Sequence, residues 1–244
     1  LGTSPQWTTS GDGFFADPTA LNTFYFPGTA DTASGNVTLT LHVSGLSACA
    51  ATTATASVAV AIAPNPGVDA GTDQVLCVTD RALLSATAWH CFSTLWSTTG
   101  DGTFVDASST ITTYLPGPSD LATGSVLLVI NGTGNGVCSL LTDADTLLLT
   151  FAPLPVAEAG ADQTLCAGSN ALLIGTATNG NTVAWSTSGS GYFTPAAALN
   201  TVYHPSESDR NAGTVWLKLT VTGASPCLMA VASDSLLLTI QPAP

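Results

Sequence analysis

Basic residues are almost absent from this sequence of 244 residues. Lys and Arg together number three (Arg81, Arg210 and Lys218), whereas Asp and Glu number sixteen, so the formal net charge is −13 at pH 7. Neutralising the phosphates of a nucleic acid takes several basic side chains. The composition therefore excludes nucleic acid as a partner.

Long hydrophobic runs and helical periodicity are also missing. No stretch approaches the roughly 18 apolar residues of a membrane-spanning helix, so we expect no membrane insertion in this segment. The N-terminus lacks the basic-then-apolar pattern of a secretion signal, and we expect targeting signals to have been removed or to lie outside this sequence. Apolar residues do not recur at the roughly 3.6-residue period of a helix, which argues against a helical fold.

A repeat of 89 residues organises what is present. Three tryptophans recur at this interval, and they are Trp7, Trp96 and Trp185. Three cysteines keep the same register, and they are Cys49, Cys138 and Cys227. The segments GTDQVLC, ending at Cys77, and GADQTLC, ending at Cys166, are again 89 residues apart. Self-similarity at a fixed interval predicts a tandem array of one structural unit.

Proline-rich segments mark the ends of the repeats, at 64–66, 153–155 and 242–244. Proline neither donates a hydrogen bond to a sheet nor continues a central strand. We therefore expect complete domains at 67–155 and 156–244, and an incomplete domain at 1–66. Leu1 corresponds to His90, so the first 23 positions of the repeat have no counterpart before it. We expect these opening strands to come from further upstream or from a neighbouring molecule, because their absence would expose sheet edges and core.

Within a repeat the hydrophobic period is two. Val215, Leu217, Leu219 and Val221 alternate with Trp216, Lys218 and Thr220, as in a half-buried strand. Some seven short strands per roughly 90 residues are typical of an immunoglobulin-like sandwich. The sequence predicts an all-β protein of tandem immunoglobulin-like antiparallel β-sandwiches, with Trp7, Trp96 and Trp185 as core anchors.

The six cysteines predict a disulfide framework and an oxidising location. The simplest pairing joins Cys77 to Cys138 and Cys166 to Cys227, within each repeat. An immunoglobulin-like path can place such partners at opposite ends of the sandwich, too far apart for a bond. The alternative is a bond between consecutive repeats, such as Cys77 with Cys227.

Two cysteines have no partner under either scheme. Cys49 would need one upstream or in another chain. Cys91 corresponds to Gly180 in the third repeat, so it is either a free thiol or part of a bond specific to its own repeat.

Aspartates are the only candidate metal ligands. Asp12 and Asp101 lie in GDG turns, where carboxylate and carbonyl oxygens suit Ca²⁺, but Asp-Gly is also a favoured tight turn. Another aspartate recurs before a strand in all three repeats, as Asp31, Asp120 and Asp209. A hydrogen bond from its side chain to a loop backbone explains this recurrence at least as well as metal binding does. No Ser/His/Asp or Cys/His set recurs at equivalent positions, so we expect no enzyme and no cofactor other than Ca²⁺.

The recurring motifs resemble a known class of repeats. Each repeat carries parts of one series of motifs: an AGxDQxLC opening, a WxTxGxGxF turn, a TxYxP step, a GxVxL strand, a late Cys and a closing LLLT strand before Pro. This series resembles the PKD-like and Ig-like repeats of Bacteroidota cell-surface adhesins. The nearest comparison is the gliding-motility adhesins that the type IX pathway secretes. The resemblance implies an extracellular, cell-surface location and attachment to surfaces or polysaccharide. It also implies O-glycosylation at Asp-Ser/Thr-apolar triplets, at Thr32, Thr146 and Ser235.

Three functions fit these observations. The leading hypothesis is a structural stalk or fibre segment of a surface adhesin, whose partners are neighbouring repeats or subunits. The second is a glycan-binding module, with Trp89 and Trp216 as the non-repeated aromatic candidates. The third is a filament subunit that polymerises by strand complementation through the incomplete first repeat.

Overall fold

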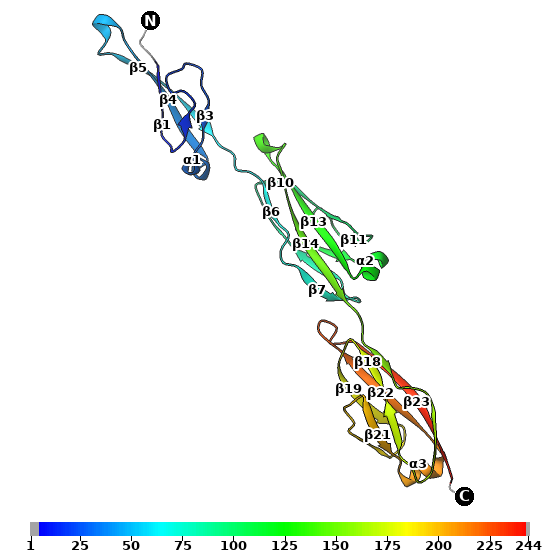
Figure 1. The fold of residues 1–244 in the computed structure, drawn as a ribbon. Coiled ribbons are helices and arrows are strands. Elements are labelled where there is room, and N and C mark those ends of the chain that lie inside the picture. The colour runs from blue at the N-terminus through cyan, green and yellow to red at the C-terminus, as the bar shows by residue number, and fades with distance from the viewer. Residues whose placement is uncertain (1–4, 243–244) are drawn as a thin grey trace. The chain divides into compact units, whose positions relative to one another are not determined.

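The computed structural model describes residues 5–242, and its secondary structure is dominated by β-strands (Figure 1). The predicted fold class, tandem immunoglobulin-like antiparallel β-sandwiches, is confirmed. The sequence segments 1–66, 67–155 and 156–244 are called repeat 1, repeat 2 and repeat 3 below. That each of them folds as a separate domain stays a prediction.

Contacts between Cα atoms group the chain into two compact units. Unit 1 comprises Leu1–Asp69, Ala86–Leu95 and Ile130–Asp145. Unit 2 comprises Ala70–Ser85, Trp96–Val129 and Thr146–Pro244. Repeat 1 therefore belongs to unit 1, and repeat 3 belongs to unit 2.

Repeat 3 shows the sandwich most completely. One sheet has the strand order β16-β23-β22-β19, the other has the order β17-β21-β20, and β15 pairs with β18. These pairs are antiparallel except β16 and β23, which run parallel. The elements are β15 (Val156–Glu158), β16 (Gln163–Cys166), β17 (Ala171–Ile174), β18 (Thr176–Thr178), β19 (Gly180–Thr187), β20 (Tyr192–Thr194), β21 (Asn200–His204), α3 (Glu207–Ala212), β22 (Thr214–Gly223) and β23 (Val231–Gln241).

The core of repeat 3 follows from the alternation along its strands. Leu217 and Leu219 on β22 are fully buried, whereas Trp216 and Lys218, on either side of Leu217, face outward. Trp185 on β19 packs into the same cluster, and its indole N–H donates to Ala198 O at 3.0 Å. A tryptophan can be buried at little cost only when its N–H has such an acceptor.

Repeat 2 has the same two sheets. Their strand orders are β10-β13-β14-β7, with β14 and β7 parallel, and β11-β12-β8. The elements are β6 (Gly67–Asp69), β7 (Gln74–Cys77), β8 (Ala82–Ser85), β9 (Thr87–Trp89), β10 (Cys91–Thr98), β11 (Thr103–Phe104), β12 (Ile111–Leu115), α2 (Pro118–Thr123), β13 (Ser125–Gly134), the 3₁₀ helix η2 (Gly136–Cys138) and β14 (Thr142–Ala152). Trp96 is buried in the position that Trp185 has in repeat 3.

The described residues of repeat 1 form the strands that are equivalent to the later strands of this pattern. Its sheets are β1-β4-β5 and β2-β3. The elements are β1 (Gln6–Thr9), β2 (Phe14–Phe15), β3 (Tyr25–Phe26), α1 (Thr29–Ser34), β4 (Asn36–Ser44), the 3₁₀ helix η1 (Ser47–Cys49) and β5 (Thr53–Ala61). Among residues 5–242, no strand pairs with the second edge of β5.

Apolar side chains of repeat 1 are less buried than their equivalents in the other repeats. Val58 on β5 is 49% exposed, whereas its equivalents Leu147 and Leu236 are 1% and 0% exposed. Trp7 and Tyr25 are likewise only half-buried. Repeat 1 therefore presents an apolar sheet face together with an open strand edge.

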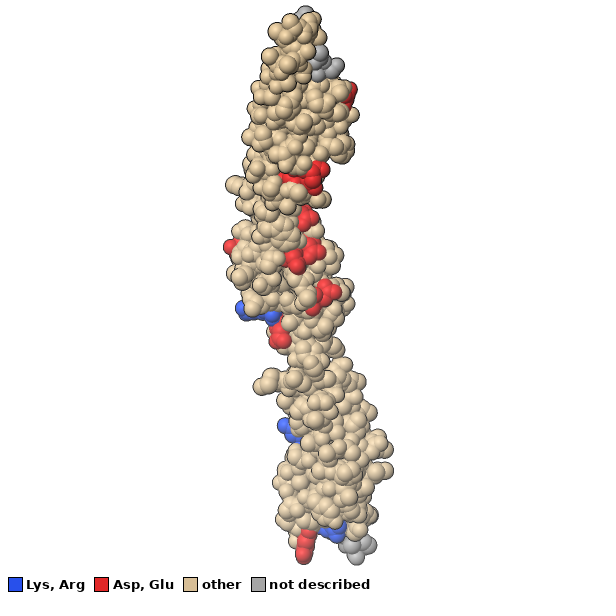
Figure 2. Space-filling view, turned by 90° about the vertical axis from the view of Figure 1, so that its left-hand side faces the viewer, with Lys and Arg blue, Asp and Glu red and all other residues tan. Residues whose placement is uncertain are grey.

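Charged side chains cover little of the surface. Figure 2 shows small acidic groups and a few basic residues, separated by wide areas that carry neither charge.

Helices are few and short. Each of the three α-helices in the described part of the chain has six residues. None of these helices is long and apolar enough to cross a membrane.

The inward and outward faces of β17 give a direct stability test. Leu173 is fully buried, whereas its neighbour Leu172 is 60% exposed. Leu173→Ala removes a core side chain and leaves a cavity, so we expect a loss of about 2–5 kcal/mol in the free energy of unfolding. Leu172→Ala, the matched control, should change it by less than about 0.5 kcal/mol. Chemical denaturation followed by tryptophan fluorescence measures both, and equal losses would contradict the assigned facing of β17.

Candidate functional site

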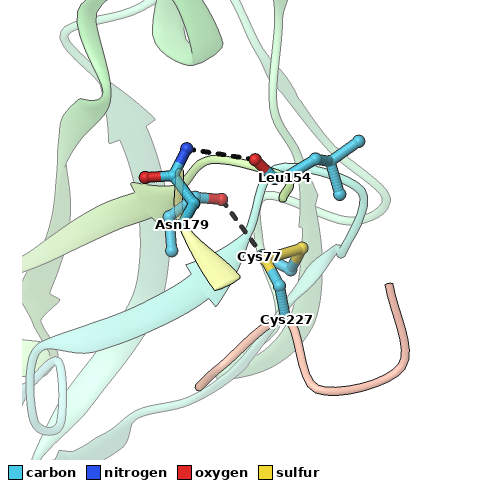
Figure 3. The surroundings of a disulfide bond; sticks show 5 residues. Cys77, Leu154, Asn179 and Cys227 are labelled. Atoms are coloured by element: carbon cyan, nitrogen blue, oxygen red, sulfur yellow. Dashed lines mark hydrogen bonds between the residues drawn. A yellow bond between two sulfur atoms is a disulfide. The ribbon is translucent and has the colours of Figure 1, made fainter. Parts of the chain in front are cut away.

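A disulfide between Cys77 and Cys227 is the most distinctive chemical feature of the chain. Cys77 ends β7, where the parallel register sets it opposite Ala152 at the end of β14. Cys227 lies in the turn between β22 and β23. The bond joins residues 150 positions apart, with 5.0 Å between their Cα atoms (Figure 3). Repeat 2 is thereby linked covalently to repeat 3.

Polar contacts surround this disulfide. Cys227 Sγ lies 3.4 Å from Ala152 O, a close contact rather than a hydrogen bond because a disulfide sulfur carries no hydrogen. The Asn179 side-chain amide donates to Leu154 O at 3.1 Å (Figure 3). The backbone N–H of Ala224 donates to Asn179 O at 3.1 Å. Asn179 therefore ties the turn that holds Cys227 to the segment that follows β14.

The predicted pairing within each repeat is wrong, and the alternative pairing is the one that the structure contains. Cys166 lies opposite Gln241 at the end of β23, whereas Cys227 precedes the start of that strand. β23 has 11 residues, which span about 36 Å at 3.3 Å per residue. Bonded cysteines need Cα atoms within about 7 Å. Cys77 and Cys138 are likewise placed at opposite ends of β14.

The other four cysteines form no disulfide within this chain, and a partner for Cys49 upstream or in another chain stays a prediction. Cys49 and Cys166 are exposed, Cys91 is half-buried, and Cys138 is buried. For Cys91 the structure selects the free thiol over a repeat-specific bond, and its Sγ lies 3.4 Å from Trp89 O. Cys138 Sγ lies 3.8 Å from Ala63 O.

A buried aspartate organises the turn that precedes each short helix. In repeat 3, the carboxylate of Asp209 accepts hydrogen bonds from the Tyr203 hydroxyl (2.7 Å) and from the backbone N–H groups of Ser190, Gly191 and Ser206 (2.9 Å each). Asp120 accepts in the same way from Tyr114 at 2.6 Å, and Asp31 accepts from Tyr25 at 2.5 Å. The recurring aspartates therefore fasten β21 or its equivalent to the GxG turn and to the helix.

These contacts shift the pKa of both partners. Burial, together with the adjacent carboxylate, raises the pKa of Tyr203 and of Tyr114 to about 12. Burial alone would raise the pKa of Asp209, but the hydrogen bonds from Ser190 N–H, Tyr203 and Ser206 outweigh it and hold that pKa below 3.8. In repeat 3 the pair is therefore the neutral phenol of Tyr203 donating to the charged carboxylate of Asp209 across the neutral pH range.

The candidate calcium ligands Asp12 and Asp101 cap helices. Asp101 Oδ1 accepts from the backbone N–H groups of Ser119 (3.1 Å) and Asp120 (3.2 Å) in the first turn of α2. Asp12 accepts likewise from Ala30 and Asp31 in α1. The pKa of each is lowered, chiefly by the N–H of Ser119 and of Ala30 respectively. A carboxylate at this position satisfies N–H groups that have no acceptor inside the helix.

Repeat 3 shows why this cap is needed. Its helix begins after Ser206, whose own hydroxyl accepts from Asp209 N–H at 3.1 Å. Gly117 and Gly28 stand at that place in the other repeats and have no side chain to do so. A Cβ on Gly117 would lie 2.1 Å from Asp101 Oδ1. The glycine thus makes room for the aspartate, and where Ser206 replaces glycine, Ser190 replaces the aspartate.

Metal binding at these aspartates stays a prediction. Within residues 5–242, no group of three or more His, Cys, Asp or Glu residues is arranged to hold a metal ion. The oxygens of Asp12 and Asp101 that face the helix are already occupied by N–H donors. The structure thus assigns these residues a structural role that the sequence did not predict.

The remaining predicted site residues lie on the surface. The side chains of Thr32, Thr146 and Ser235, the predicted O-glycosylation sites, are all exposed. Trp89 and Trp216, the aromatic candidates for glycan binding, are 48% and 53% exposed. Modification and glycan binding both stay predictions.

No protein-family model and no curated protein matches the sequence. Many solved structures are similar in fold, and three examples of tandem repeats among them follow. Cadherin domains EC3-6 of protocadherin gammaB7, a cis-dimer, are 10% identical with a TM-score of 0.40 over 100% of this chain and 67% of that one. Mouse cadherin-23 EC22-24 is 13% identical (TM-score 0.44, 98% of this chain, 86% of that one). The titin I9-I11 tandem is 11% identical (TM-score 0.33, 99% of this chain, 90% of that one).

The tyrosine pKa values predict an alkaline transition. Because the pKa of Tyr114 and Tyr203 is raised from 10.0 to about 12, their contribution to stability is full below pH 10 and is lost as the pH rises through about 12. In a titration followed by tyrosinate absorbance, these two residues should ionise near pH 12. Tyr203→Phe should remove one late-ionising group, and ionisation of all tyrosines near pH 10 would contradict the assignment.

The packing of Asp101 against Gly117 predicts a steric effect. Gly117→Ala places a methyl group against the carboxylate, so we expect a loss of about 1–3 kcal/mol in the free energy of unfolding. Gly168→Ala is the control, because no atom lies within 4 Å of its added Cβ. Chemical denaturation measures both variants, and a neutral Gly117→Ala would show that Asp101 is not held there.

Proposed function

We propose that this chain is a structural segment of an extracellular stalk or fibre, in which the Cys77–Cys227 disulfide carries tension past folded β-sandwiches. The observation that carries this proposal is the position of the bond. It joins the last residue of β7 in repeat 2 to the turn before β23 in repeat 3. A force applied to the two ends of the chain crosses from residue 77 to residue 227 through two sulfur atoms.

The residues between the two cysteines are thereby shielded from tension. They include β8 to β14 and β15 to β22, which is most of repeat 2 and repeat 3. The covalent bond carries the load that would otherwise pass along this segment of the chain. The contour length of the segment between the two cysteines is therefore not released under a force that unfolds an ordinary sandwich.

Several features support an extracellular, cell-surface location. A disulfide of this kind persists in oxidising compartments and is rare in the cytosol. The sequence motifs resemble repeats of Bacteroidota surface adhesins, and the predicted O-glycosylation sites are exposed. Neighbouring repeats and subunits of the same protein are the proposed partners, and surface polysaccharide is a further candidate.

We propose no catalytic activity. The Asp–Tyr pairs are among the polar groups that recur in all three repeats, and their atoms are engaged in hydrogen bonds that hold a turn together. A reacting group needs a free lone pair or proton and room for a substrate. The recurring chemistry therefore belongs to the scaffold.

Single-molecule force spectroscopy tests the load-bearing proposal. With the disulfide intact, stretching by the two ends should not release the contour of the segment between the cysteines, which lie 150 positions apart. Cys77→Ala, or reduction, should release about 500 Å of additional contour, at roughly 3.3–3.6 Å per residue. Cys91→Ala is the matched control and should leave the trace unchanged. Equal contour lengths for the oxidised and reduced chain would contradict the proposal.

Glycan binding remains the second candidate because of one observation. Trp216 is 53% exposed on β22, next to Lys218 on the same outward face, and an exposed indole is a suitable platform for a sugar ring. Screening the chain on a glycan array, with Trp216→Ala as the comparison, tests this function. Binding that is lost in the variant would establish it, and the absence of any bound glycan would reject it.

A further inference from the structure

We propose that the open edge of β5 and the thiol of Cys138 together form an acceptor site for one further β-strand. The occupant is another copy of the opening segment of this repeat, with the pattern GxDQxLC, and its cysteine forms a disulfide with Cys138. This inference rests on the register of the repeats and does not depend on the load-bearing function.

The first observation is the strand edge. In repeat 2 the equivalent strand β14 carries β7 as a parallel partner, with Cys77 opposite Ala152. In repeat 3, β23 carries β16 with Cys166 opposite Gln241. β5 has the same sequence position, but within the described residues its second edge has no strand beside it.

The side chains beside that edge are built for burial. Val58 is 49% exposed, whereas Leu147 and Leu236 at the equivalent positions are buried. The alternating apolar residues Val58, Val60 and Ile62 face the side that the opening strands cover in the other repeats. Exposed apolar surface beside an open strand edge favours the addition of a strand.

The second observation is independent and concerns Cys138. Its side chain is only 9% exposed, and its thiol has no disulfide partner. Its Sγ lies 3.8 Å from Ala63 O, just as Cys227 Sγ lies 3.4 Å from Ala152 O. Cys138 is the equivalent of Cys227, and Ala63 is the equivalent of Ala152. Cys138 thus has the same surroundings as Cys227, but it has no disulfide partner within this chain.

The two observations define one geometry. A strand paired with β5 in the register of β7 on β14 ends with its cysteine opposite Ala63. Ala63 is the residue whose carbonyl contacts Cys138. The incoming strand therefore completes the sheet of repeat 1 and delivers its thiol to Cys138 in one docking event.

The chemistry of the bond needs an oxidant. The two thiols lose two protons and two electrons as the S–S bond forms. Glutathione disulfide accepts them in two exchange steps: it first forms a mixed disulfide and releases one glutathione thiol, and attack by the second cysteine then releases the other.

A chimera tests the proposal in one chain. A copy of residues 67–89 is placed directly before Leu1, which corresponds to His90, so that the repeat register is preserved. After refolding with glutathione disulfide, we expect a disulfide between the added cysteine and Cys138. Hydrogen exchange of the β5 amides should slow by about tenfold or more as the new strand pairs with them.

Matched variants separate docking from bond formation. Cys138→Ala in the chimera should abolish the new disulfide, whereas Cys91→Ala and Cys166→Ala should retain it. A chimera with a scrambled insert of the same composition should show neither the bond nor slower exchange in β5. An added cysteine that stays reduced, or that distributes over Cys49, Cys91 and Cys166, would overturn the proposal.

The same segment supplied as a free peptide tests the site without altering the chain. A peptide of residues 67–89, added with glutathione disulfide, should become attached at Cys138 in preference to the exposed thiols of Cys49 and Cys166. Because Cys138 is the least exposed of the free cysteines, attachment there requires docking. Attachment in order of thiol exposure would overturn the acceptor site.

Discussion

A parallel strand pair at the edge of a sheet determines where the cysteines of this chain can meet. The second strand of a repeat, β7 or β16, lies beside the strand that closes the repeat, β14 or β23, and both run in the same direction. The cysteine of that second strand therefore lies beside the C-terminal end of the closing strand. The late cysteine of the same repeat lies just before the N-terminal end of the closing strand. A bond within one repeat is impossible at these positions, and the cysteine of the second strand is left for the late cysteine of the next repeat.

Much of this architecture is visible in the sequence, because burial and turn chemistry repeat with the same period. The alternation of Val215, Leu217, Leu219 and Val221 predicts β22, and the structure buries those four residues. The 89-residue repeat also shows which positions of the three repeats are equivalent, even where the residues at those positions differ. The immunoglobulin-like class follows from short alternating strands punctuated by glycine and proline.

The wrong disulfide pairing has a physical cause. Sequence separation favoured Cys77 with Cys138, but chain length along the sequence says nothing about which end of a sandwich a residue occupies. That depends on strand order, which only the long-range pairing of β7 with β14 reveals. The role of Asp101 was hidden for a similar reason, because the helix it caps begins 17 residues later, at Pro118. One sequence signal does identify the capping role of Asp101. In repeat 3, Ser190 stands in place of Asp101 and Ser206 stands in place of Gly117, so the two positions change together.

Disulfide mapping of the intact chain tests the link between consecutive repeats most directly. Free thiols are first alkylated without reduction, and the chain is then digested with trypsin, which cuts only at Arg81, Arg210 and Lys218. Cys77 then lies in fragment 1–81, Cys138 and Cys166 lie in fragment 82–210, and Cys227 lies in fragment 219–244. The account predicts a covalent pair of fragments 1–81 and 219–244, with Cys138 and Cys166 alkylated. Fragment 82–210 linked to both of the others, with no bond between 1–81 and 219–244, would contradict it.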